Sequence, residues 1–167
     1  MVSLRIAPSL SLSLSASLLK LYLRRMSWQG YIDNLLAPDD KGRLPVQEAA
    51  ICGFAPGQES VWASTPGMNN ISAEEIRKLA GKRDTFGQCG PCVGGMKCRM
   101  LRDNMEDEKM YSLDLKSAAD AEGNTYSVCV GKSKQALVIA RGTKDATGGQ
   151  LAPKVFSIVE HLRKAGF

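Results

Sequence analysis

Four short β-rich segments follow one another in the second half of the chain, and this run constrains the fold more than any other feature of the sequence. The segments are residues 97–102, 110–115, 125–130 and 135–141. Turn signals such as Glu122-Gly123-Asn124 separate them. Parallel strands need a crossover connection of about a dozen residues or more, and these links are too short for that. The run therefore predicts an antiparallel meander.

Two more strands and a short helix are predicted upstream of the meander. Residues 49–54 and 61–64 are apolar runs bounded by glycine and proline, which favours strands. Ser72 and Glu75 form a capping box, in which each side chain bonds to the backbone N–H of the other residue. The helix that starts there has an apolar face, and Gly81 is suited to follow its last turn.

Two further helices are predicted at the ends of the domain. Ser27 can cap a helix over residues 28–37, which Pro38 ends. Gly148-Gly149 predicts a break, and the last helix follows it, with Pro153 near its first turn, where a missing N–H costs nothing. The chain is therefore predicted to fold as an α/β (α+β) domain.

The positive charge of the chain is concentrated near its start. The chain has 167 residues and a net charge of +5, and its first 25 residues contain Arg5, Lys20, Arg24 and Arg25 but no acid. Subtracting these four charges leaves +1 from Met26 onward, which argues against a nucleic-acid partner. No apolar run reaches the roughly 18 residues that a transmembrane span requires.

Within residues 1–25, the segment 9–19 alternates serine and leucine, and three interpretations of the extension compete. A signal peptide would need a cleavage site that is not evident, whereas a mitochondrial presequence would share the serine, the arginine and the lack of acids. The third interpretation is a non-native extension or an upstream in-frame start. We favour the third, because a domain-like pattern follows Met26 at once. We expect a disordered or loosely docked extension over 1–25 and one domain over 26–167.

Several short segments stand out in a fixed order along the chain. They are MSWQGYIDNL at 26–35, AAI at 49–51, SVWA at 60–63, GGMKC at 94–98, LRD at 101–103, GG at 148–149 and HLR at 161–163. Their order and spacing resemble the profilin family, and its animal members more than its plant ones. The resemblance implies a central antiparallel sheet with the N- and C-terminal helices on one face and the shorter helix on the other.

The resemblance also implies an aromatic groove for proline-rich proteins. The residues that it assigns to this groove are Trp28, Tyr31, Trp62, His161 and Phe167. Flat rings can pack on the prolines of a polyproline II helix, while indole N–H and phenol O–H groups bond to its carbonyls. Helical spacing places Trp28 and Tyr31 on one face. The residues alone leave open that these two rings belong to the core.

A second surface is implied for monomeric actin. Its residues would be Lys97, Met100, Arg102, Lys116, Thr125 and Gly149. Basic residues there would complement an acidic partner. Phosphoinositide binding is implied for a partly overlapping basic set, namely Lys97, Arg102, Lys116, Arg163 and Lys164. The implied function is regulation of actin polymerisation in the cytoplasm and cytoskeleton, without catalysis and without a cofactor.

The second surface departs from the family pattern at several positions. Gly87 and Gln88 stand where bulkier residues are usual, Thr147 stands where histidine is common, and Ala152-Pro153 replaces Asn-Lys. These differences remove contact area and polar groups. We therefore expect weaker actin binding than in a typical profilin and better preserved binding of proline-rich peptides. A peptide adaptor with little actin binding is the alternative.

Cysteine provides the remaining alternatives. Five cysteines at irregular spacing do not predict a disulfide framework, so free thiols in a reducing cytosol are expected. Cys89-Gly90-Pro91-Cys92 has the letters of a thioredoxin site, but Val93-Gly94-Gly95 cannot begin the helix which that chemistry needs. A regulatory disulfide at Cys89 and Cys92 stays open. A zinc site that adds Cys98 and His161 lacks the expected ligand spacing.

Overall fold

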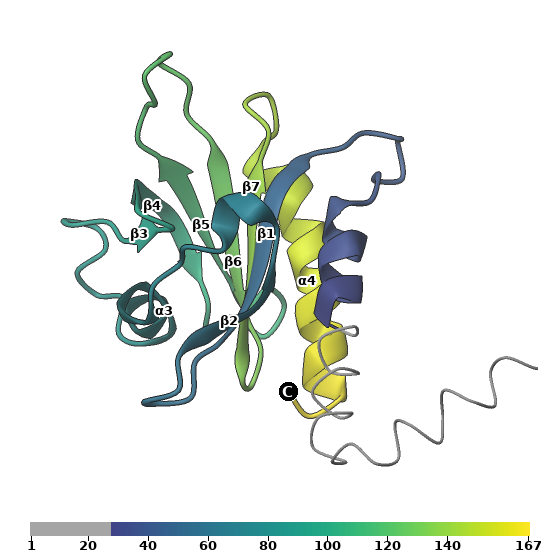
Figure 1. Cartoon of the computed structure of the whole chain (residues 1–167), viewed down its shortest axis with the longest axis vertical. Coiled ribbons are helices and arrows are strands. Elements are labelled where there is room, and N and C mark those ends of the chain that lie inside the picture. Colours follow the sequence, from purple (N-terminus) through teal and green to yellow (C-terminus); the bar gives the residue numbers. More distant parts are fainter. Residues whose placement is uncertain (1–27) are drawn as a thin grey trace, which may run out of the picture.

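The computed structural model describes residues 28–167 and contains one antiparallel sheet (Figure 1). Its strands are β1 (Val46–Gly53), β2 (Ser60–Ser64), β3 (Cys92–Val93), β4 (Met96–Asn104), β5 (Ser112–Ser117), β6 (Ser127–Lys132) and β7 (Ala136–Gly142). They lie in the order β2-β1-β7-β6-β5-β4-β3. The prediction of an antiparallel meander is confirmed, with β4 to β7 as neighbours in sequence order. The expected extension over 1–25 and the Ser27 cap lie outside the described residues.

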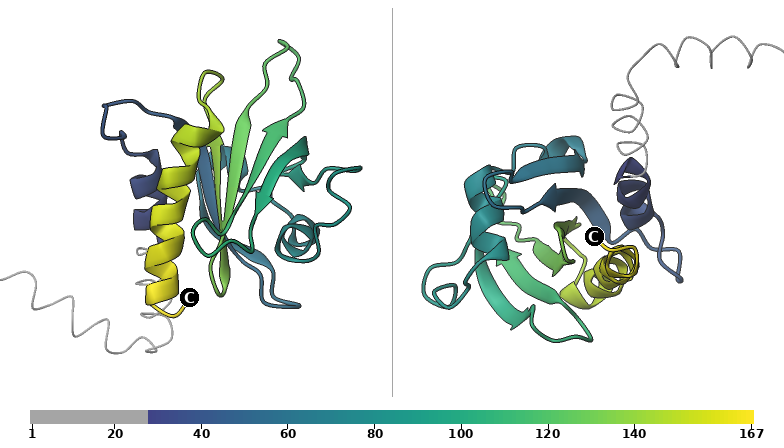
Figure 2. Two further views of the ribbon diagram at one scale, coloured as in Figure 1. Left: turned by 180° about the vertical axis from the view of Figure 1, so that it is seen from behind. Right: turned by 90° about the horizontal axis from the view of Figure 1, so that it is seen from below.

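Helices cover both faces of the sheet. The N-terminal helix (residues 28–36) and α4 (Gly148–Lys164) lie side by side on one face, and α3 (Ala73–Ala80) lies on the other (Figures 1 and 2). A short 3-10 helix, η2 (Pro66–Met68), follows β2. This arrangement confirms the predicted α+β fold. Within residues 28–167, no helix combines the length and the apolar character needed to cross a bilayer.

The alternation of side chains along the strands builds a core on each face. In β7, Ala136, Val138 and Ala140 belong to the core under the N-terminal helix and α4. Leu137 and Ile139, the residues between them, belong to the core under α3. All five are fully buried, because a central strand covered on both faces has no solvent-facing side.

Local signals predicted the short helix well. The Ser72 hydroxyl accepts a bond from the Glu75 N–H at 3.1 Å, and the Glu75 carboxylate accepts one from the Ser72 N–H at 3.1 Å. The helix ends at Ala80, and Gly81 has a φ of −92°, so it does not adopt the left-handed conformation. The Gly81 N–H instead closes the end of α3 by donating to the Arg77 carbonyl at 3.0 Å.

Two strands of the meander begin later than predicted. The segment predicted from residue 110 becomes β5 only at Ser112, because Tyr111 has a φ of +49° and its N–H bonds to the Asp107 carbonyl in a turn. The segment predicted from residue 125 becomes β6 at Ser127, because the Asp120 side chain holds the preceding turn through the Asn124 N–H. Polar turn residues keep these positions out of the ladder.

The predicted start of the last helix was wrong. Gly148-Gly149 does not break the chain but forms the first turn of α4, and Pro153 lies inside the helix. The Gln150 side chain accepts a bond from the Thr147 N–H at 2.9 Å and caps this end. The missing N–H of Pro153 leaves the Gly149 carbonyl without its helical donor, which is tolerable because Gly149 is exposed to water.

Candidate functional site

An aromatic cluster forms where the N-terminal helix, β2 and the end of the chain meet. The ring centroids of Trp28 and Trp62 are 4.8 Å apart, and those of Trp28 and Tyr31 are 5.4 Å apart. Phe167 meets Trp28 edge to face at 5.3 Å, and His161 lies 5.6 Å from Tyr31. The structure thus brings together all five residues that the family resemblance assigned to a peptide groove.

The five rings differ in exposure. Trp28 is buried, Tyr31, Trp62 and Phe167 are half-buried, and His161 is exposed. Within the described part of the chain, the indole N–H of Trp28 has no hydrogen-bond acceptor. A buried donor without a partner costs free energy, which an incoming carbonyl could recover if the neighbouring rings shift. The cluster therefore offers flat apolar faces together with polar edges.

Backbone contacts hold the last residue of the chain in the cluster. The Phe167 N–H donates to the Leu162 carbonyl at 2.8 Å, and the Phe167 carbonyl accepts from the Lys134 N–H at 2.8 Å. These bonds tie the residue to the end of α4 and to the β6–β7 turn.

Gly53 also contributes to the cluster, although it was not among the residues predicted for the groove. A Cβ atom at this position would lie 2.3 Å from Cζ2 of Trp62, so the indole rests directly on the glycine backbone. The only signal in the sequence was a glycine within a strand, which often marks a close approach of another group.

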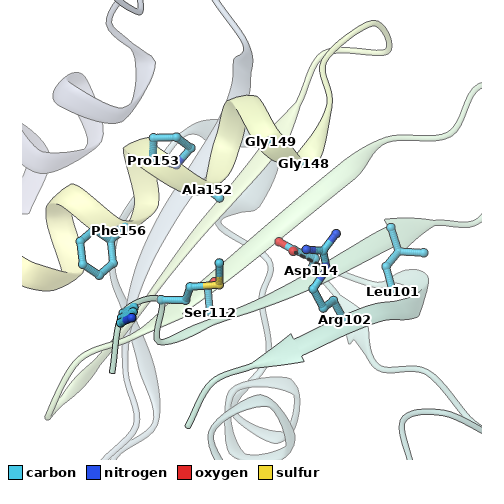
Figure 3. Close-up of a pocket in the computed structure, with 11 residues that line it drawn as sticks. Leu101, Arg102, Ser112, Asp114, Gly148, Gly149, Ala152, Pro153 and Phe156 are labelled. Carbon is cyan, nitrogen blue, oxygen red and sulfur yellow. Dashed lines mark ion pairs between the residues drawn. The ribbon is translucent and has the colours of Figure 1, made fainter. Parts of the chain in front are cut away.

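A pocket of about 480 Å³ lies between the start of α4 and strands β4 and β5 (Figure 3). Its walls are largely apolar, and Leu101 and Met110 are 53% and 42% exposed beside it. The residues that line it are Leu101, Arg102, Lys109, Met110, Ser112, Asp114, Gly148, Gly149, Ala152, Pro153 and Phe156. Large exposed apolar side chains around a hollow are typical of a surface that binds a partner.

The residues predicted for actin are distributed around this pocket. Arg102 and Gly149 line it, while Lys97, Lys116 and Thr125 lie further along β4, β5 and the loop before β6. Met100 does not join them, because its side chain packs against the core under α3. Arg99, which the prediction omitted, is exposed and is the register partner of Lys116. The surface therefore has four basic residues on two neighbouring strands.

One acidic group lies within this basic surface. The Asp114 carboxylate is 3.9 Å from the Arg102 guanidinium (Figure 3), and within residues 28–167 its buried Oδ1 atom accepts no hydrogen bond of ordinary geometry. Burial raises the pKa of Asp114, and this effect outweighs the opposing attraction of Arg102. A partner that binds the pocket would bury this carboxylate further.

The phosphoinositide residues divide into two separate groups. Lys97, Arg102 and Lys116 belong to the basic surface, whereas Arg163 and Lys164 end α4. The Arg163 guanidinium lies over the Tyr111 ring at 3.4 Å and donates to the Lys132 carbonyl at 2.8 Å. This arginine therefore has a structural role in joining α4 to the sheet.

Comparison with known proteins places the whole described fold in one family. The family model that matches residues 26–167 is described as Profilin. Human profilin-1 is 34% identical over 143 residues, which are 84% of this chain and 98% of the human protein. The chain belongs to the profilin family. Rat profilin-2 is likewise 34% identical over 143 residues, with the same coverage of 84% and 98%.

Solved profilin structures share the architecture. Mouse profilin IIa, in complex with a double repeat from the FH1 domain of mDia1, superposes with a TM-score of 0.75 at 34% identity and covers 84% of this chain and 99% of its own. LokiProfilin1, in complex with rabbit actin, has a TM-score of 0.55 at 15% identity, with 84% and 96% covered. The second likeness concerns the fold alone.

The CxxC motif of this profilin leads into a strand, whereas the motif of a thioredoxin site opens a helix. Cys92 begins the strand β3, and Gly94 and Gly95, both with positive φ, turn the chain into β4. Cys89 lies in the loop before it. Neither cysteine is at a helix N-terminus, so the helix dipole that activates a thioredoxin thiol is missing at this motif. Within residues 28–167, no three histidine, cysteine or acidic side chains gather as a metal site.

Proposed function

We propose that this protein binds monomeric actin, regulates actin polymerisation and recruits proline-rich peptides, through non-covalent contacts and without catalysis. Membership of the profilin family supports the regulatory role. The two surfaces described above are the sites proposed for these partners.

The aromatic cluster carries the proposal for peptide binding. Trp28, Trp62 and Phe167 come from three distant parts of the chain. The ring centroids of Trp62 and Phe167 lie 4.8 and 5.3 Å from that of Trp28. A polyproline II helix is pre-formed, so its binding costs little ordering entropy and depends mainly on such flat faces. The mouse relative solved with an FH1 repeat supports this assignment.

The pocketed surface on β4, β5 and α4 is the proposed actin site. Leu101 and Met110 supply apolar area, and Lys97, Arg102 and Lys116 supply positive charge. Apolar centres bordered by charge are typical of protein interfaces. Phosphoinositide binding is proposed for these three basic residues alone, because Arg163 is committed to Tyr111 and Lys132, and Lys164 pairs with Glu160 at 3.6 Å.

Titration with a decaproline peptide, followed by tryptophan fluorescence, tests the proposal. Both tryptophans of the chain lie in the cluster, so binding must change their emission. The variant Tyr31→Ala keeps both tryptophans as fluorescent reporters and removes one ring from the groove. We expect it to bind the peptide at least about tenfold more weakly, which is the loss typical when an important aromatic residue of an interface is truncated. Tyr126→Ala is the matched control, because Tyr126 bonds to Asp120 outside the cluster.

Two outcomes would redirect the proposal. If the tryptophan emission of the folded protein does not change when the peptide is added, the aromatic site is excluded. Peptide binding with neither binding to monomeric actin nor an effect on actin polymerisation would select the adaptor alternative, in which the differences at Ala152 and Pro153 have removed actin binding.

A further inference from the structure

The five cysteines divide into two groups by exposure. Cys52, Cys98 and Cys129 are buried, and burial raises the pKa of Cys52 and Cys98 to about 12. Cys89 and Cys92 are free and exposed. Since the thiolate is the reactive form, an oxidant in solution can react with Cys89 and Cys92 while the protein stays folded, and the buried three are protected.

The segment that contains the exposed pair lies along the outer edge of β4. Cys92 is the register partner of Lys97, and the Pro91 carbonyl accepts a bond from the Cys98 N–H at 2.9 Å. A Cβ atom on Gly90 would lie 1.9 Å from the Cys98 carbonyl oxygen, so the backbone at this position is pressed against β4. Pro91 and the strand β3 (Cys92–Val93) thus lie hydrogen-bonded along the edge of β4, with Gly90 packed against the same strand.

A disulfide between Cys89 and Cys92 is incompatible with a fully extended segment. Its two Cα atoms must lie within about 7 Å of each other. Three residues of extended chain span roughly 10 Å. Closing the bond therefore requires a bend at Gly90-Pro91, which would pull the Pro91 carbonyl away from the Cys98 N–H.

We propose that Cys89 and Cys92 are a redox-active pair that glutathione disulfide oxidises to an intramolecular disulfide, and that this disulfide detaches residues 90–92 from β4. One thiolate attacks glutathione disulfide and releases the first glutathione, leaving a mixed disulfide. The second thiolate attacks the protein sulfur of that bond and releases the second glutathione. The pair loses two electrons and two protons, and glutathione disulfide becomes two glutathione molecules.

The sheet contacts make this disulfide easy to reduce. Because the closed form loses the bond between Pro91 and Cys98, the folded protein stabilises the dithiol. Disulfides opposed by the fold have higher reduction potentials and are the reversible ones. Lys97 is paired with Cys92, so oxidation also disturbs the basic surface; this consequence rests on the proposed actin site, whereas the redox pair itself does not.

Mass spectrometry in glutathione redox buffers tests the chemistry. The tryptic peptide 84–97 contains Cys89 and Cys92 and no other cysteine. We expect it to lose two hydrogens on oxidation, while Cys52, Cys98 and Cys129 remain open to alkylation after denaturation. In the variants Cys89→Ser and Cys92→Ser, the remaining exposed cysteine has no second thiol to displace glutathione. Each variant should therefore retain one glutathione on that cysteine.

Amide hydrogen exchange tests the structural step. We expect the Cys98 amide to exchange at least about tenfold faster in the oxidised protein, since its acceptor is removed. The Ala118 amide, which bonds to the Lys97 carbonyl on the other side of β4 at 2.8 Å, is the control and should stay protected. Stable glutathione adducts on both cysteines of the wild-type protein, or unchanged protection of Cys98 after oxidation, would overturn the proposal.

Discussion

At the scale of single residues, Asp114 shows how a charge within the proposed actin surface affects stability. Its carboxylate is mostly covered, and burial raises its pKa. The folded state therefore binds this proton more tightly than the unfolded state does. Stability from this group is present below the ordinary aspartate pKa and is lost as the pH rises through the raised pKa of the folded protein.

The neutral variant Asp114→Asn should accordingly be more stable than the wild type at pH 7. The difference should shrink as the pH falls toward the ordinary aspartate pKa of 3.8, because the wild-type carboxyl then becomes neutral as well. Urea unfolding at both pH values measures this. Asp84→Asn removes the same charge from an exposed loop and serves as the control. A stability difference that is independent of pH would contradict the assignment to burial.

At the scale of elements, the contact between α4 and β6 fixes the helix that both surfaces share. Gly131 of β6 faces this helix, and an added Cβ would lie 2.5 Å from Cγ1 of Val155 and 2.5 Å from Cγ2 of Val159. Valine side chains in a helix have one strongly preferred rotamer, so they cannot easily move aside. The glycine therefore sets how closely the helix approaches the sheet.

Gly131→Ala should lower the free energy of unfolding by about 1–3 kcal/mol through overpacking. Gly148→Ala is the matched control on the first turn of α4, where no atom lies near the added Cβ. It should be neutral or slightly stabilising, because alanine favours helix more than glycine does. Chemical denaturation compares the two variants, and equal stability of both would show that the helix can shift without cost.

At the scale of the whole molecule, α4 connects the two proposed sites without merging them. Gly149 lines the pocket near the start of the helix, and His161 joins the aromatic cluster near its end. His161 lies twelve positions after Gly149, which corresponds to roughly 18 Å along the helix axis. No residue of the aromatic cluster lines the pocket.

We therefore expect the protein to bind actin and a proline-rich peptide at the same time. The dissociation constant for decaproline should stay within about twofold when actin monomer is saturating, because the sites share no contact and the coupling free energy is small. Fluorescence anisotropy of a labelled peptide, with and without actin, measures this. Displacement of the peptide by actin would mean that the two surfaces overlap.

Local signals in the sequence determined most elements of this protein. The capping box at Ser72 and Glu75 marked α3, and short polar links between apolar runs predicted the antiparallel meander. Such signals act within a few residues, so they survive outside the context of the fold. They failed at the start of α4, where glycine and proline argued against helix but the Gln150 cap and the burial of Leu151 outweighed that preference.

The aromatic cluster was only partly determined by local sequence. Helical spacing placed Trp28 beside Tyr31, and the family resemblance supplied the other three rings. Their actual convergence depends on tertiary structure: β2 pairs with β1 so that Trp62 rests on Gly53, and α4 packs on the sheet so that Phe167 can bond to Lys134. Contacts between such distant residues depend on strand register and helix packing, which no short stretch of sequence specifies.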